Sequence, residues 1–496
     1  MDHRADNNQK DREATSSGPV LALTAARAAQ TGWAVTPVAD RLAVVARLRR
    51  RIAERAEALV AALADRPGRT PAESLAAEIL PLADACRFLE REAAALLRPR
   101  RLGSRGRPGW LFGVKAEVRR EPFGTMLVIA PSNYPLLLAG VQAMQALAAG
   151  NAVLVKPAPG CAEPMVLIGR WLAEAGLPEG VFAVLGDSPA EAEAVIDAGV
   201  EKVVLTGSAE TGRRVMARLA DRLIPATMEL SGNDAVFVLP GADPGFVAGA
   251  LAFGLRFNGS ATCIAPRRVF VTRDRAAELE RALAGRIAGL PATPVPLPVR
   301  ARLARLVEEA LGLGGRLAGP APAVDSPELA PVVVADARPD MALLSEDVFA
   351  PVLALIPVSD MEEALRLAAA SPYALGASIF GPEAEARALA LRVDAGSVTV
   401  NDLIAPTADP RLPFGGRRRS GWGVTRGAEG LLEMTQVKTV TVSPGRFRPH
   451  HAPLRDRDAA LLLAWLRLAH GGLAQGGGRA AARSLLSALS RRLRPR

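Results

Sequence analysis

Short apolar runs alternate with helical stretches along residues 124–230. The apolar runs predict strands at these positions: 125–130, 152–155, 181–185, 202–206 and 226–229. Apolar residues at helical spacing predict helices between them: 136–149, 162–175, 190–198 and 212–220. This alternation is typical of right-handed βαβ units, which form a parallel sheet with helices on both faces. Such a sheet binds its ligands beyond the carboxyl ends of the strands.

A second unit with the same alternation starts near residue 233. Its predicted strands are 235–239, 268–272, 352–358 and 396–400, and its predicted helices are 245–257, 275–288, 299–312 and 361–370. The proline-rich piece 291–298 predicts a surface loop. The fold class that we expect is therefore α/β, with two doubly wound α/β domains.

The remaining segments flank these two units. Residues 37–66 and 72–97 have apolar positions at helical spacing, whereas residues 1–20 are polar and predict a disordered N-terminus. Alternating polarity predicts a hairpin within 101–120, and residues 437–442 predict one more strand.

Charge and composition narrow the classes of function. The chain has 496 residues and a formal net charge of +10, but residues 445–496 contain eleven Arg against Asp456 and Asp458. The rest is nearly neutral, which argues against nucleic acid as a partner. We find no leader peptide and no apolar stretch of about 18 residues, the length of a membrane span. We therefore expect a cytoplasmic protein with a basic tail.

The cysteines and histidines point to one candidate nucleophile. Cys86, Cys161 and Cys263 lie far apart, which favours free thiols over disulfides or a metal site. All four histidines lie near the chain ends, so a central nucleophile needs another base. The small neighbours of Cys263 favour access, although a lone cysteine is most often a small core residue. Glu229, at a predicted strand end, is the candidate base, or else a buried carboxylate with a partner.

Two further polar side chains follow predicted strands. Asn133 follows the strand 125–130, where its amide can donate to a developing oxyanion or merely cap the next helix. Lys156 follows the strand 152–155, at the edge where nucleotides bind, although a solvated lysine is common there.

A glycine turn follows the strand 202–206. Gly207, Ser208 and Gly212 lead into a helix whose first N–H groups, with the serine hydroxyl, suit a pyrophosphate. The signal is weak alone, because many strand–helix turns have this composition.

Taken in order, these stretches resemble the aldehyde dehydrogenase family. The resemblance covers residues 25–443. Within this range, the stretches 346–352 and 412–421 also match the family. It implies oxidation of an aldehyde to a carboxylic acid with NAD or NADP. It further implies that Cys263 is the nucleophile, that Asn133 and the Cys263 N–H hold the oxyanion, and that Glu229 activates the hydrolytic water.

The resemblance also implies a cofactor site, and no metal. Its residues are Ile129, Pro131, Lys156, Pro159, Gly207, Ser208, Gly212, Asp347 and Phe349. Pro159 stands where the family often has a ribose-binding glutamate. The absence of this glutamate removes an acceptor for the ribose hydroxyls and a charge that would repel a 2′-phosphate, so we expect tolerance of NADP. Asp347 is one methylene shorter than the usual glutamate.

The substrate and two rival functions follow from the same resemblance. The expected substrate contacts are Tyr134, Leu138, Thr262, Ile264 and Phe414. Their apolar character favours aliphatic or aromatic aldehydes over acidic semialdehydes. One alternative is an acylating, coenzyme A-dependent aldehyde dehydrogenase, against which the retained Glu229 argues. The other is an inactive homologue that serves as a scaffold.

The pattern of predicted elements and the family resemblance together predict the domain organisation. After a disordered N-terminus (1–20), the expected parts are a cofactor-binding domain (21–103 and 123–231), a catalytic domain (232–433), oligomerisation strands (104–122 and 434–444) and a basic tail (445–496). The strands favour a homodimer or homotetramer. In the tail, 459–468 and 479–494 predict helices, and the second could contact an anionic membrane surface peripherally or be a solvated extension.

Overall fold

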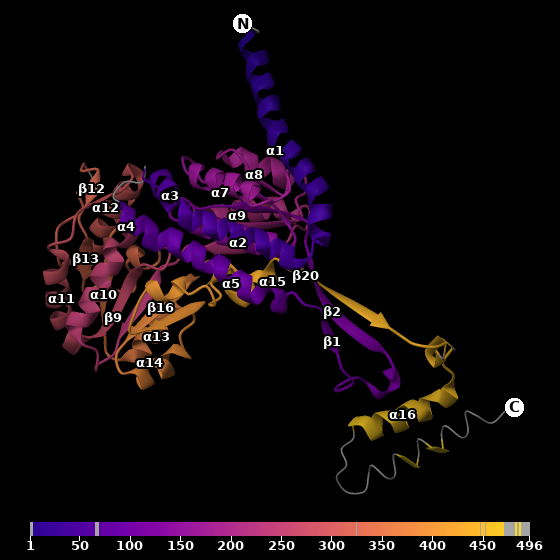
Figure 1. The fold of residues 1–496 in the computed structure, drawn as a ribbon. Helices are drawn as coiled ribbons and strands as arrows, with labels where there is room; N and C mark the ends of the chain where they lie inside the picture. Colours follow the sequence, from indigo (N-terminus) through magenta and orange to yellow (C-terminus); the bar gives the residue numbers. More distant parts are fainter. Residues whose placement is uncertain are drawn as a thin grey trace. The chain divides into compact units, whose positions relative to one another are not determined.

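A computed structural model describes residues 3–64, 69–323, 325–446, 448–451, 453–470, 482–483 and 486–487. Two open, mostly parallel sheets with helices on both faces make up most of it (Figure 1). The α/β class with two doubly wound sheets is therefore confirmed.

The first sheet has six strands, built from the first predicted unit and one late strand. In spatial order they are β19 (Gly421–Trp422), β7 (Ala226–Leu230), β6 (Lys202–Gly207), β3 (Thr125–Ile129), β4 (Ala152–Lys156) and β5 (Phe182–Val184). All neighbours are parallel except β19, which pairs antiparallel to β7 with Gly421 opposite Glu229.

Helices cover both faces of the first sheet because its strands are apolar on both sides. One face packs against α6 (Leu137–Ala149) and α7 (Glu163–Glu174), and α2 (Val38–Glu54) and α5 (Leu80–Leu96) pack on these helices. The other face packs against α1 (His3–Val35), α8 (Pro189–Asp197) and α9 (Ala209–Ala220).

The second sheet has seven strands. In spatial order they are β11 (Arg316–Leu317), β13 (Val332–Ala335), β14 (Val352–Val358), β9 (Pro266–Thr272), β8 (Asp234–Val238), β16 (Gly376–Phe380) and β17 (Ser397–Val400). Its faces pack against α10 (Pro244–Arg256) and α11 (Arg273–Ile287) on one side, and α12 (Leu297–Gly312) and α14 (Glu383–Ala390) on the other. The helix α13 (Met361–Ala369) lies on that second side too, against β14, β9 and β8.

Several elements differ from the sequence prediction. The structure adds β13, β16 and α14, and it places β10 (Thr293–Pro294) and the start of α12 within the proline-rich piece expected to be a loop. The segment expected to be disordered, 1–20, is helical from His3, within α1. Adding residues to a formed helix is easier than nucleating one, so the packed part of α1 can extend into this polar sequence.

The chain divides into two compact units. Met1–Arg100 and Val118–Thr439 form one, and Arg101–Glu117 and Val440–Arg496 form the other. The narrow third sheet has the order β1 (Arg100–Leu102), β2 (Lys115–Pro122) and β20 (Thr435–Val442). The boundary between a cofactor-binding and a catalytic domain near residue 231 stays a prediction.

The predicted tail helix 459–468 lies within α16 (Asp456–His470), which exposes Leu462, Leu463 and Leu466. Most of the second predicted tail helix, 479–494, lies outside the described residues. Within the described part of the chain, no helix is both long and apolar enough to cross a bilayer.

Candidate active site

Cys263 and Glu229 come from distant parts of the sequence and meet in the fold. Cys263 lies in the loop before β9, and Glu229 lies near the end of β7. The Cys263 Sγ atom is 3.8 Å from the Glu229 Oε1 atom, within hydrogen-bond range for sulfur. The structure thus places the predicted nucleophile and the predicted base in contact.

A short polar chain holds the Glu229 carboxylate. Thr206 Oγ1 donates to Glu229 Oε2 at 3.4 Å, and Gln142 Nε2 donates to Thr206 Oγ1 at 2.9 Å. Glu229 is 2% exposed. Burial raises the pKa of its carboxyl group, while the charge of Arg426 and the bonds from Thr206 and Cys263 oppose that rise. The raised pKa makes this carboxylate a stronger base than a solvent-exposed one.

The surroundings of Cys263 favour the protonated thiol over the thiolate. Burial raises the pKa of Cys263 well above its usual value, and the neighbouring carboxylates of Glu229 and Asp234 raise it further. Arg426 is the cation that opposes this rise. A base must therefore take the thiol proton before the sulfur can attack, and Glu229 is in contact with it.

An unusual backbone presents Cys263. Asn258, Gly259 and Ser260 all have left-handed φ angles, between 52° and 60°. Arg267 clamps this turn, because its Nη2 donates to the Ser260 backbone O at 2.7 Å and its Nη1 donates to Ser260 Oγ at 3.0 Å. Burial lowers the pKa of Arg267 to about 10. Left-handed residues outside glycine are uncommon and cluster at functional sites.

The amide of Asn133 is fixed next to the Cys263 loop. Its Nδ2 donates to the Ala261 backbone O at 3.0 Å, and its Oδ1 accepts from the Tyr134 N–H at 3.0 Å. An asparagine amide has two N–H donors, so one remains for a substrate oxygen. The backbone N–H of Cys263 donates to no acceptor among the described residues.

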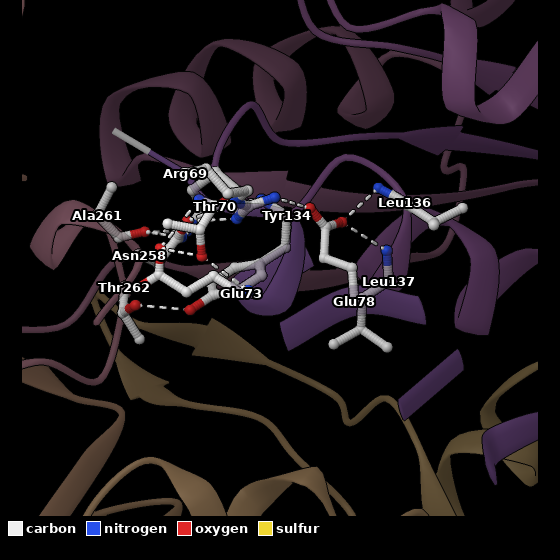
Figure 2. A network of polar contacts seen from close by, with 11 residues as sticks. Arg69, Thr70, Glu73, Glu78, Tyr134, Leu136, Leu137, Asn258, Ala261 and Thr262 are labelled. Carbon is white, nitrogen blue, oxygen red and sulfur yellow. Dashed lines mark hydrogen bonds and ion pairs between the residues drawn. The ribbon is translucent and has the colours of Figure 1, made fainter. Parts of the chain in front are cut away.

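Arg69 and Glu78 form a buried polar network (Figure 2). The side chains are 3% and 0% exposed. Arg69 donates to Glu78, to the Asn133 backbone O at 3.0 Å and to Asn258 Oδ1. Glu78 Oε2 accepts the backbone N–H groups of Leu136 and Leu137, at 2.7 and 3.0 Å, where α6 begins.

This network was not predicted from the sequence. Glu78 lies in a stretch that was predicted only as helical, and its backbone partners are 58 and 59 positions away. The available signal was a glutamate at a position of the helix that the apolar pattern assigns to the core.

One cavity of about 300 Å³ reaches Cys263. The structure places all five expected substrate residues in its wall: Tyr134, Leu138, Thr262, Ile264 and Phe414. Most of the wall is apolar, but Arg426 is also part of it, and the sequence analysis did not identify this residue. Tyr134 Oη and Thr262 Oγ1 are hydrogen-bonded at 2.6 Å, so these hydroxyls satisfy each other.

The first sheet contributes most of the expected cofactor residues. Lys156 ends β4, and its ammonium group donates to no acceptor among the described residues. Burial lowers the pKa of Lys156, and the nearby Asp187 opposes that shift. Asp187 was not predicted; it accepts from the Gly160 N–H at 2.8 Å. Pro159 is exposed and offers no carboxylate.

The glycine turn at β6 also fits a dinucleotide. Ser208 caps α9, where its Oγ accepts the Thr211 N–H at 3.1 Å. A Cβ at Gly212 would lie 2.7 Å from Leu230, so the helix packs closely on the sheet. The start of α9 thus provides backbone donors at the carboxyl edge of β6.

Asp347 is an expected cofactor residue that lies outside the first sheet. Its Oδ1 atom is buried without a hydrogen-bond partner among the described residues. An unpaired carboxylate oxygen and an unpaired Lys156 ammonium fit the hydroxyls of a dinucleotide. Ile129 and Pro131 are buried at the end of β3, and Phe349 is half-buried near Asp347. The described residues hold no cluster of three or more metal-ligating side chains.

Sequence comparisons agree with this geometry. A sequence model of the aldehyde dehydrogenase family matches residues 9–440. The chain is 33% identical to a 4,4′-diapolycopene aldehyde oxidase of Methylomonas sp over 83% of this chain and 79% of that protein. It is 31% identical to a putative NADP-dependent succinate-semialdehyde dehydrogenase of Mycobacterium bovis, over 86% of this chain and 85% of that protein.

Solved structures are similar over most of the chain. A Mycobacterium tuberculosis aldehyde dehydrogenase complexed with NAD+ has 28% identity and a TM-score of 0.80, covering 87% of this chain and 92% of that one. An NADP-dependent glyceraldehyde-3-phosphate dehydrogenase of Bacillus halodurans, complexed with NADP, has 27% identity and a TM-score of 0.81, covering 86% and 91%.

Proposed function

The chain belongs to the aldehyde dehydrogenase family and is an NAD(P)-dependent enzyme, and we propose that Cys263, Glu229 and Asn133 carry out its reaction. The observation that supports this assignment most is the 3.8 Å contact between Cys263 Sγ and Glu229 Oε1 beside a cavity. A half-buried thiol in contact with a buried carboxylate suits a nucleophile and its base.

The first half of the proposed reaction forms a thioester on Cys263. Glu229 takes the thiol proton, and the sulfur attacks the aldehyde carbon. The oxygen becomes an oxyanion, which accepts hydrogen bonds from Asn133 Nδ2 and the Cys263 N–H. When bound, NAD or NADP accepts the hydride that leaves this carbon.

The second half releases the acid. Glu229 first releases the thiol proton to solvent and then takes a proton from a water molecule, and the resulting hydroxide attacks the thioester carbon. The carbon–sulfur bond breaks, and Cys263 leaves as a thiolate. The hydrogen bonds from Gln142 to Thr206 and from Thr206 to Glu229 keep the Glu229 carboxylate near the sulfur through both steps.

Single-turnover kinetics test the two roles separately. Glu229→Gln is expected to give a slower burst of NAD(P)H that still approaches about one per site, because loss of the Glu229 charge lowers the pKa of Cys263 and partly replaces the missing base. Turnover afterwards is expected to be slow, because the acyl-enzyme persists. Cys263→Ser is expected to give no burst. Equal bursts from the wild type and Cys263→Ser would contradict the assignment.

The rival functions are separated by other measurements. An acylating enzyme would turn over faster with coenzyme A, whereas hydrolysis through Glu229 predicts no acceleration. A scaffold would release no NAD(P)H on mixing with a reactive aldehyde, whereas the proposed enzyme releases it stoichiometrically.

A further inference from the structure

Arg426 places a cation in the wall of the cavity that reaches Cys263. The guanidinium lies over the ring of Phe414, with Cζ 5.0 Å from the ring centroid. Its Nη1 donates to the Thr407 backbone O at 2.5 Å. Because Phe414 and Thr407 line the same cavity, the charged group is held among cavity residues.

Most donors of this guanidinium are unused. Arg426 Nε is buried without an acceptor, and Nη2 has no hydrogen bond within the part of the chain that the structure describes. The same part of the chain contains no ion pair of Arg426. Unpaired donors of a charged group in an apolar wall are unfavourable, and an anionic ligand would satisfy them.

The backbone fixes the position of this side chain. Arg426 has a left-handed φ of 62° directly before α15 (Gly427–Glu433). Its N–H donates to Gln145 Oε1 at 3.2 Å, and Gln145 Nε2 donates to the Gly427 O at 3.2 Å. A positive φ is uncommon for a residue with a Cβ and persists where surrounding structure imposes it.

We propose that Arg426 binds a carboxylate at the far end of the aldehyde substrate. The substrates that fit are oxo acids whose apolar carbon chain lies along Leu138 and Ile264 while the aldehyde reaches Cys263. This inference rests on the proposed function and names the substrate class of that same site. This substrate class differs from the uncharged aldehydes expected from the sequence, because Arg426 was not among the expected pocket residues.

Matched substrates test the carboxylate contact. The kcat/KM values of succinic and adipic semialdehyde are compared with those of their methyl esters, which keep the chain and remove the charge. In the wild type, the better acid is expected to exceed its ester by about tenfold to a hundredfold, the effect of one charge-assisted pair. Arg426→Leu is expected to remove that preference, so that the acid-to-ester ratio of kcat/KM falls to about one. The ester loses some kcat/KM as well, because the Arg426 charge opposes the rise in the pKa of Glu229 and Cys263. Arg426→Lys is expected to keep part of it.

The control is Arg419→Leu, because Arg419 is an exposed arginine of the same glycine-rich segment and lies outside the cavity wall. It is expected to leave the preference unchanged. Thermal melting checks that each variant is folded. Equal wild-type kcat/KM values for acids and esters would overturn the proposal. An equal fall for acid and ester in a folded Arg426→Leu protein would overturn it too, because the cation would then serve the reaction and not the substrate.

A binding measurement separates this inference from the proposed function. Calorimetric titration of succinate and adipate into the Cys263→Ser protein requires no catalysis. Binding that falls at least tenfold in the Cys263→Ser, Arg426→Leu protein supports the carboxylate contact even if no aldehyde is oxidised. Unchanged binding, or none in either protein, overturns the contact and leaves the function of Cys263 to its own test.

Discussion

The proton on Cys263 controls the reactivity of this site at the scale of the residue. Its pKa is raised by burial first and by the Glu229 charge second. Glu229 therefore has two opposite effects: it disfavours the thiolate at rest and accepts the proton when the sulfur attacks. The two effects can be separated in the free enzyme.

Alkylation kinetics are expected to show the resting effect. Glu229→Gln removes a negative charge 3.8 Å from the sulfur, so the pKa of Cys263 falls and more thiolate is present at a given pH. The pH profile of iodoacetamide alkylation should move to lower pH in this variant. Cys263→Ser corrects for Cys86 and Cys161. A profile that moves to higher pH would mean that Glu229 activates the thiol already at rest.

At the same scale, we expect Pro159 to influence the choice between NAD and NADP. Pro159→Glu is expected to raise the KM for NADP by about tenfold or more, because a carboxylate there would repel a 2′-phosphate near Lys156. Pro159→Gln is the uncharged control and should leave that KM near the wild-type value. Steady-state KM values for both cofactors measure the effect. A wild-type preference for NAD by several orders of magnitude would contradict the expected NADP tolerance and point to Asp187 as the discriminating acid.

Single residues with local signals were predictable, and those defined by distant partners were not. Cys263, Glu229 and Asn133 each follow a strand or lie in a small-residue loop, so sequence order suffices to propose them. Arg69 and Arg426 have no such pattern. Their partners, among them Asn258, Phe414 and Gln145, meet them only through the tertiary fold.

At the scale of elements, the start of α6 depends on the Arg69–Glu78 pair. Glu78→Gln leaves the Arg69 charge buried without its partner, and removal of one partner of such a pair destabilises by about 3–5 kcal/mol. Arg69→Met with Glu78→Gln is expected to be less destabilised than the sum of the single changes. Urea unfolding of the three variants measures this coupling. Additive losses would show that the pair does not act as a unit.

Gly232 lies where the loop after β7 passes the Cys263 loop. A Cβ at this position would be 2.7 Å from the Cys263 backbone O and 3.0 Å from Leu375 Cβ. Gly232→Ala is therefore expected to move the nucleophile and lower kcat/KM by about a hundredfold. Gly249→Ala, in α10 with free space around it, is the matched control. It should keep full activity and gain up to about 1 kcal/mol in unfolding free energy.

The strands that were predictable are those with long apolar runs. β3, β4 and β6 are buried on both faces and contain consecutive Val, Leu or Ile residues. β16 lies between β8 and β17 but begins Gly-Ala-Ser, so its composition resembles a turn. The proline-rich piece was misjudged because proline also favours the first turn of a helix, as at Pro298 in α12.

At the scale of the whole molecule, the basic tail is expected to affect binding to anionic membranes. A form of residues 1–445 lacks the net charge of the tail and the apolar residues that α16 exposes. It is expected to co-sediment less with anionic liposomes than the full chain, and neutral liposomes should bind neither form. Equal sedimentation of both forms would contradict a membrane contact. A homodimer or homotetramer stays a prediction, based on the exposed strand β20.

The three thiols of this protein differ in accessibility. Cys86 and Cys161 are buried, while Cys263 alone among them borders the cavity that also contains Arg426. A small electrophile joined through a short alkyl spacer to an acidic group would be guided to one sulfur by the cation. Such a compound would serve as a selective covalent inhibitor, and its uncharged ester would label the protein slowly. The pairing of one reachable sulfur with one unpaired cation thus gives a design rule for a chemical probe.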